Sequence, residues 1–103
     1  MSLQNIKSGT VTGTGAAQNI SLGWVPDHVV IANVTDGDVI DFWWNGMTAA
    51  TSIKVDTAAG TRAASDGISA YEGSTTATPG FTIGAGISEN AKVLRYTAMR
   101  NSQ

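Results

Sequence analysis

The sequence predicts an all-β protein, a small antiparallel β-sandwich or jelly-roll-like barrel built as a single domain of 103 residues. Short segments rich in Val, Ile, Thr and aromatic residues recur at roughly the 8–12-residue spacing that is typical of sandwiches and barrels. Turn-forming segments separate them, among them the glycine-rich residues 13–15 and 84–90. No window has the periodicity of an amphipathic helix, which leaves an all-β fold as the prediction.

We expect strands at residues 6–12, 19–22, 28–35, 38–45, 51–56, 67–72, 81–83 and 92–100. Pro26 supports an extended entry to the third strand, because a proline disfavours helical geometry in the residue before it. Residues 47–50 are compatible with a helical turn, but the residues that follow have a strand pattern, so we interpret 46–60 as a loop and then a strand. Residues 1–103 form one domain in this prediction, with 1–8 as an extended amino-terminal arm.

The hairpin at residues 29–45 is the most informative part of the sequence. Asp36-Gly37 is favoured in two-residue hairpin turns, in which both central residues need positive φ. A turn there places Ile31 opposite Phe42, and a four-residue loop over 35–38 keeps the same pairing. This register assigns the strand residues to two faces.

The first predicted face carries Val29, Ile31, Asn33, Ile40, Phe42 and Trp44, and the second carries Val30, Ala32, Val34, Val39, Asp41 and Trp43. Both faces are mainly apolar, whereas a half-exposed sheet alternates apolar and polar residues. We expect Trp44 in the core. We expect Trp43 to contact the domain's own second sheet, another subunit or partner, or a sugar ring.

Composition narrows the class of protein further. Only 14% of residues are charged, against an average of about 25%. The net charge of −2 provides no basic surface for nucleic acid or anionic lipid, so we expect neither as a partner. Cysteine is absent, and no apolar run has the length of a membrane span or of a signal-peptide core. A small, weakly charged β domain without disulfides often gains stability by oligomerising.

No pattern for catalysis, cofactor binding or metal binding stands out. His28 is the single histidine and no Gly-x-Ser-x-Gly motif accompanies it, which favours a strand-edge role. Asp36, Asp38 and Asp41 offer carboxylates for hydrolysis or calcium, but aspartates at a hairpin tip commonly support the turn. The glycines of 9–15 lack the spacing of a phosphate-binding loop. We therefore expect a protein that is not an enzyme and that holds no cofactor or metal.

Residues 9–30 resemble small bacteriophage virion proteins. These proteins typically open with a Thr-Gly-x-Gly hairpin, here 12–15, followed by an Ile-x-Leu-Gly-aromatic-x-Pro segment, here 20–26, and a valine-rich strand. The similarity continues at residues 33–38, 42–43, 46–47, 67–71, 80–84, 88–90 and 96–98. It departs at Asn90-Ala91, where similar proteins often have Asn-Gly. The resemblance implies a virion component, in a stand-alone head protein or a fibre tip, and brings no active-site residues.

These observations lead us to expect a capsid decoration protein, made in the cytoplasm of the infected bacterium and located on the outer capsid surface of the virion. We expect the major capsid protein as its partner and a homo-oligomer, a homotrimer, as its form. The expected interface residues are Leu3, Ile6, Val30, Val34, Val39 and Trp43, with 3–7 docking as an added edge strand.

The alternative is a tail or head fibre-tip module that binds host-surface glycan through Trp24 or Trp43. A free-standing chain with its own start methionine fits the decoration role better than a fibre module. A small hydrolase that uses the hairpin aspartates ranks third.

Overall fold

The computed structural model describes residues 5–37, 39–47, 51–55 and 60–100, with the side chains of 60–66 excepted. The strands are β1 (Ile6–Thr12), β2 (Gln18–Ser21), β3 (His28–Asn33), β4 (Val39–Trp44), β5 (Thr51–Val55), β6 (Gly60–Tyr71), β7 (Gly80–Ile83) and β8 (Val93–Met99). They form one antiparallel sheet in the order β1-β8-β3-β4-β5-β6-β7-β2. The predicted all-β fold class is confirmed.

Seven of the eight strands lie within two residues of their predicted bounds, and β6 is the exception. It begins at Gly60, although only 67–72 was predicted as strand. Residues 60–66 lack a strand pattern of their own, and their pairing with β5 sets their conformation. At the other end of the chain, residues 6–8 of the predicted arm belong to β1 and pair with β8, while 1–4 lie outside the described residues.

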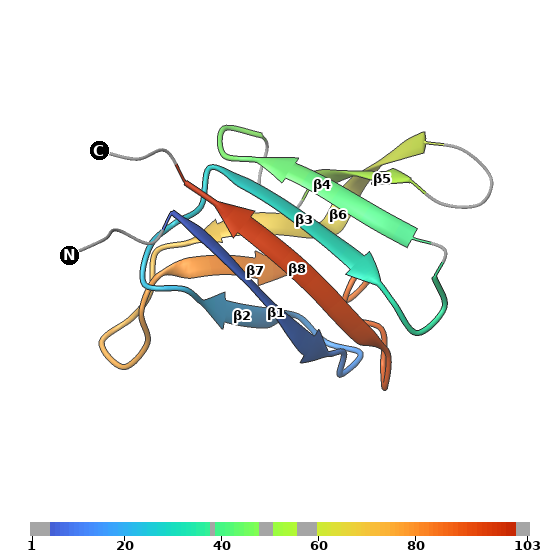
Figure 1. The fold of residues 1–103 in the computed structure, drawn as a ribbon, viewed down its shortest axis with the longest axis horizontal. Coiled ribbons are helices and arrows are strands. Elements are labelled where there is room, and N and C mark those ends of the chain that lie inside the picture. The colour runs from blue at the N-terminus through green and yellow to red at the C-terminus, as the bar shows by residue number, and fades with distance from the viewer. Residues whose placement is uncertain (1–4, 38, 48–50, 56–59, 101–103) are drawn as a thin grey trace.

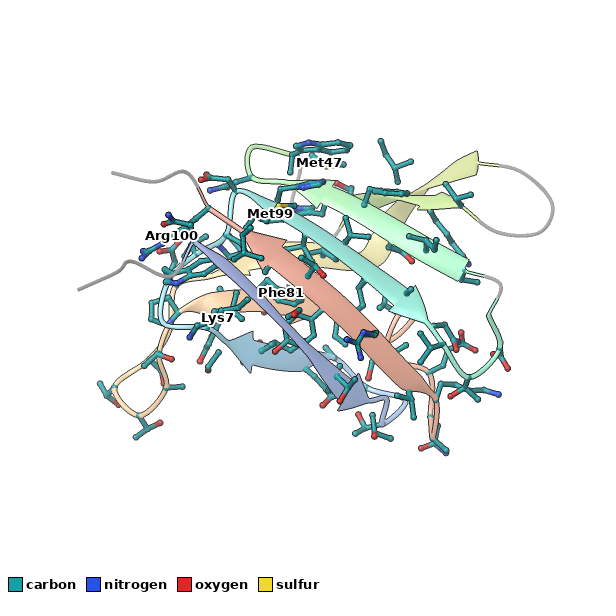
Figure 2. All side chains as sticks on the ribbon, in the orientation of Figure 1. Lys7, Met47, Phe81, Met99 and Arg100 are labelled. Atoms are coloured by element: carbon teal, nitrogen blue, oxygen red, sulfur yellow. The ribbon has the colours of Figure 1, made fainter. Side chains whose placement is uncertain are left out.

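The sheet curls so that β1, β8 and β3 lie in front of β2, β7 and β6 (Figure 1). The core fills the space between these layers and consists of Ile20, Leu22, Val29, Ile31, Trp43, Ile68, Phe81, Ile83, Ile87, Leu94 and Ala98. Phe81 lies between the layers (Figure 2) and meets the ring of Tyr96 edge to face, with centroids 5.5 Å apart. One inner face from each half of the sheet thus makes a sandwich-like core.

Side chains link the two edge strands, β1 and β2, where the curled sheet closes on itself. Lys7 of β1 donates a hydrogen bond to the carbonyl of Leu22, and Gln18 of β2 donates one to the carbonyl of Thr12 at 3.0 Å. The connection from β1 to β2 also rests on the β7–β8 loop. A Cβ on Gly13 would lie 1.8 Å from the carbonyl oxygen of Glu89, so this approach requires glycine.

The β3–β4 hairpin forms as predicted, but its register differs by one residue. Strand β3 ends at Asn33 and β4 begins at Val39, so five positions separate them instead of two or four. Val30 therefore pairs with Phe42, and Ile31 pairs with Asp41. A shift of one residue moves a strand's side chains to the opposite face of the sheet.

Asn33 accounts for the longer loop. Its side chain is buried, its Oδ1 accepts a hydrogen bond from the Asp36 amide at 3.0 Å, and its carbonyl accepts one from Gly37, whose φ is 71°. Beyond Asn33 the chain stays beside β8, where the amide of Val34 donates to the carbonyl of Val93 and Thr35 Oγ1 accepts from the Val93 amide. These bonds hold Val34 and Thr35 beside β8 instead of opposite β4, so the loop between β3 and β4 begins at residue 34.

Because of the register shift, the two tryptophans of β4 have the opposite burial from the one predicted. Trp43, which was predicted to contact the domain's own second sheet, another subunit or partner, or a sugar ring, pairs with Val29 and is 1% exposed. Trp44, which was predicted in the core, is 46% exposed. Trp43 is therefore a core residue. Of its three predicted contacts, the one within the domain itself is observed, and the interface at its side chain is wrong.

Replacing Trp43 by alanine is expected to destabilise the fold by about 3–5 kcal/mol, because it opens a large cavity in the centre of the core. The free energy of unfolding from urea titrations measures this change. Trp44→Ala on the same strand is the matched control, and its cost should be much smaller because nearly half of that side chain already contacts water. Equal losses in the two variants would contradict the observed register.

Candidate interaction surface

Three neighbouring strands present an apolar outer face. Across them, Phe42 of β4 lies between Val30 of β3 and Ile53 of β5, and Ile40 lies between Ala32 and Val55. We define the apolar face as Val30, Ile40, Phe42, Trp44, Ile53 and Val55.

Four members of this face are strongly exposed: Ile40 by 39%, Trp44 by 46%, Ile53 by 38% and Val55 by 41%. Their exposed area is on the order of 300 Å², the size of the larger apolar patches on monomers, which often mark contact sites.

The other half of the sheet has a polar outer face. In β2, β7 and the described side chains of β6, the outward positions carry Asn19, Ser21, Ser69, Tyr71, Gly80 and Thr82. Thr82 Oγ1 donates a hydrogen bond of 2.7 Å to Asn19 Oδ1. This half has the alternation expected of a sheet with one face in water. The apolar face is therefore a property of β3, β4 and β5 and not of the sheet as a whole.

Aromatic and sulfur-containing side chains gather at one end of the apolar face. The ring of His28 stacks on that of Trp44, with centroids 5.3 Å apart and planes at 26°. Met47 Sδ lies 3.3 Å from the Trp44 amide as a hydrogen-bond acceptor, and Met99 pairs with His28 across β8 and β3. Figure 2 shows Met47 beyond the end of β4. These contacts hold a half-exposed indole in a defined position.

Trp24 and Trp43 are less available for stacking. The guanidinium of Arg100 lies 4.8 Å from the centroid of the Trp24 ring and covers one side of it. Trp43 is enclosed in the core, where its Nε1 has no hydrogen-bond partner. Trp44 is thus the tryptophan with the most accessible ring, although the glycan hypothesis relied on the other two.

The predicted interface residues lie in different parts of the structure. Val30 belongs to the apolar face, Val34 is 49% exposed in the β3–β4 loop, and Ile6 is 59% exposed on β1. Val39 is half-buried and lines a small cavity on the same side of β4 as the buried Asp41, so it does not share the outer face with Val30. Trp43 is in the core, and Leu3 lies outside the described residues.

The outer residues of β4 and β5 were missed as contact candidates. The alternation of Ile53 and Val55 with Lys54 was a usable signal for β5. Ile40, Phe42 and Trp44 were assigned to the same face as Val29 and Ile31, and Trp44 to the core, because the predicted loop had an even number of residues. Only the odd loop places them outside.

The two hairpin aspartates that the structure describes, Asp36 and Asp41, lie in different environments and do not form one site. Asp36 forms a salt bridge of 3.1 Å with Lys92, Asp41 is 3% exposed on the inner side of β4, and Asp38 lies outside the described residues. Ser52 Oγ donates a 2.7 Å hydrogen bond to Asp41 Oδ2. Burial raises the pKa of Asp41 from its usual 3.8, although the Ser52 hydrogen bond and the charge of Lys54 act in the opposite direction.

Asp41 lines a cavity of about 20 Å³ together with Ile31, Ala32, Asn33, Val39, Lys54, Gly86, Ile87, Glu89 and Leu94. This volume holds about one water molecule and has no room for an organic substrate. Within the described ranges, no three His, Asp or Glu side chains gather as they would around a metal ion. The same part of the chain contains no helix long and apolar enough to cross a membrane.

Comparisons with protein-family models, with curated proteins and with solved structures find no match for this chain. The geometry of the apolar face therefore carries the functional argument.

Replacing Asp41 by asparagine should change how stability depends on pH. Because the pKa of the folded state is raised, the contribution of Asp41 is fully present below 3.8 and is lost as pH rises through the raised pKa. The asparagine side chain cannot ionise, so the difference in unfolding free energy should shift in favour of Asp41→Asn across that window. Urea titrations at a series of pH values measure it.

Ser52→Ala is the companion variant, because it removes the hydrogen bond that favours the carboxylate. The folded-state pKa of Asp41 should then rise further, so the upper end of the window moves to higher pH while the lower end stays at 3.8. A shift in favour of the wild-type protein as pH rises would mean that the attraction of Lys54 outweighs burial.

Proposed function

We propose that this protein is a structural component of a bacteriophage virion, a capsid decoration protein without enzymatic activity. The observation that carries the proposal is the apolar face of β3, β4 and β5, exposed on a chain with only 14% charged residues. A surface of this kind is stable in a crowded assembly, where other protein covers it. The resemblance of 9–30 and of later segments to small virion proteins supports the same class.

The work of such a protein is mechanical. A ligand that binds only the assembled state adds its binding free energy to the stability of that state. A chain that docks across several copies of the major capsid protein therefore raises the free energy needed to separate them. Apolar residues at other corners of the molecule, Ile6 on β1 and Val34 in the β3–β4 loop, extend the surface available for such contacts.

The sequence expectation of three copies and of a place on the outer capsid surface remains part of this proposal. Low charge and the polar outer face of β2, β6 and β7 fit that place, because one side of the molecule suits contact with water and another suits contact with protein.

A fibre-tip module that binds glycan is the second candidate. The accessible Trp44 ring, with His28 stacked beside it, is the specific observation that favours it, since sugar rings stack on exposed indoles. Trp44 takes the place of Trp24 and Trp43 in this hypothesis.

A co-sedimentation experiment with purified capsids that lack the protein tests the decoration role. We expect saturable binding with a fixed number of copies per capsid and a higher melting temperature of the decorated shell. Cryo-electron microscopy of the decorated particle then locates the chain. Failure to bind any capsid form, together with quenching of tryptophan fluorescence by a saccharide, would support the glycan hypothesis.

Trp44→Ser provides a sharper comparison. In the decoration role it should weaken capsid binding by about tenfold or more, equivalent to at least about 1.4 kcal/mol, because it removes a large apolar contact. Ser21→Ala on the polar outer face is the control and should bind as the wild-type protein does. Equal affinity of Trp44→Ser and wild type would remove the apolar face from the capsid contact.

A further inference from the structure

We propose that Asn45 is a site of spontaneous covalent modification, at which the main-chain amide of Gly46 attacks the side-chain amide of Asn45 and the asparagine becomes aspartate or isoaspartate. These two residues directly follow β4, where the chain leaves the sheet (Figure 1). They form the single Asn-Gly pair in the sequence. The modification does not depend on the proposed function, but it places its product beside the apolar face.

Both reacting groups are accessible. Asn45 and Gly46 are exposed. Among the residues that the structure describes, none holds the Asn45 side chain or the Gly46 amide by a hydrogen bond. Gly46 has a φ of 107°, which favours glycine, and a Cβ at this position would meet nothing within 4 Å. A base in the solvent therefore reaches the amide proton of Gly46 without displacing protein atoms.

The reaction needs only water as a co-reactant. A base removes the proton of the Gly46 amide, the nitrogen forms a bond to Cγ of Asn45, and Nδ2 leaves as ammonia. Because the attack is intramolecular and closes a succinimide ring, it avoids the entropy cost of a bimolecular step. Water then opens the ring. Cleavage of the new bond from Cγ to nitrogen gives aspartate, and cleavage of the bond from the main-chain carbonyl to the Gly46 nitrogen gives isoaspartate.

Asn90 is also exposed and precedes a small residue, but hydrogen bonding distinguishes it from Asn45. The amide of Ala91 donates a 2.9 Å hydrogen bond to the carbonyl of Gly13. This bond stabilises the protonated amide and directs it toward Gly13 instead of toward the side chain of Asn90. Ala91 also carries a Cβ, which crowds the attacking nitrogen. Asn90 is therefore the internal reference for the rate at Asn45.

The remaining described asparagines are less reactive for local reasons. Asn33 is buried, and the amide of the next residue, Val34, donates to the carbonyl of Val93 at 3.0 Å. Asn5 and Asn19 each precede an isoleucine, whose branched side chain hinders attack by its own amide. Only at residues 45–46, within the described part of the chain, do an exposed asparagine, an amide without a hydrogen bond and a glycine coincide.

The products change the end of the apolar face at Trp44. Either product adds a negative charge directly after this half-exposed indole. Isoaspartate also lengthens the main chain between Trp44 and Met47. Two contacts span that segment: the Met47 amide donates to the Trp44 carbonyl at 3.2 Å, and Met47 Sδ accepts from the Trp44 amide at 3.3 Å. An apolar contact surface therefore becomes charged at this end as the protein ages.

Peptide mass spectrometry of the wild-type chain, incubated at neutral and at mildly alkaline pH, tests the inference. The peptide that contains Asn45 should gain about one dalton and separate into two products, aspartate and isoaspartate. The rate should rise with pH, because the deprotonated amide is the nucleophile, and should exceed the rate at Asn90 by at least about tenfold. An unmodified Asn45, or equal rates at the two asparagines, overturns the inference.

Asn45→Gln is the test variant, because its longer side chain closes a larger and less favourable ring. The mass gain should be lost from this peptide, whereas Asn90→Gln, the matched control, should leave the rate at Asn45 unchanged. Unfolding in guanidinium releases the Ala91 amide from Gly13, so the rate at Asn90 should rise there. A rate at Asn90 that is the same in the folded and unfolded chain would contradict protection by this hydrogen bond.

These measurements contain no capsid, so their outcome is independent of the proposed function. Its consequence for the apolar face is tested with Asn45→Asp, which should bind capsids severalfold more weakly than Asn90→Asp. Equal binding by the two variants would contradict the effect on the contact surface and leave the modification itself in place.

Discussion

The buried side chain of Asn33 and the loop it organises set the arrangement of the whole molecule. Asn33 binds Asp36 through both its side-chain oxygen and nitrogen, and its Nδ2 also lies 3.3 Å from Glu89 in the β7–β8 loop. The salt bridge from Lys92 to Asp36 ties the same two loops together. Because a buried polar side chain is costly without partners, this network stabilises one loop length and so one register of β3 against β4.

That register determines which side chains of β4 are buried and which are exposed. On the inner side, Trp43 lies in the core and Asp41 is buried. Asp41 accepts a hydrogen bond from Ser52 and interacts electrostatically with Lys54. On the outer side, Ile40, Phe42 and Trp44 join β5 to make the apolar face. The burial of a carboxylate and the exposure of an indole are thus two results of the same pairing.

The outer faces of the two halves of the sheet differ in polarity. Asn19, Ser21, Ser69 and Thr82 lie on the outside of β2, β6 and β7, and apolar residues lie on the outside of β3, β4 and β5. A single domain with one polar and one apolar exterior is suited to a place between water and other protein. This asymmetry supports the assembly function that we propose.

The sequence by itself determined the all-β class, the positions of seven strands, and the apolar character of both faces of the β3–β4 hairpin. These properties depend on local composition and on a two-residue period, which are visible along the chain. It did not determine β6 before residue 67, because residues 60–66 become strand through pairing with β5. Nor did it determine which tryptophan is buried. The identity of the outer face depends on whether the β3–β4 loop has an odd or an even number of residues, and contacts from β8 and the β7–β8 loop, distant in sequence, decide that number.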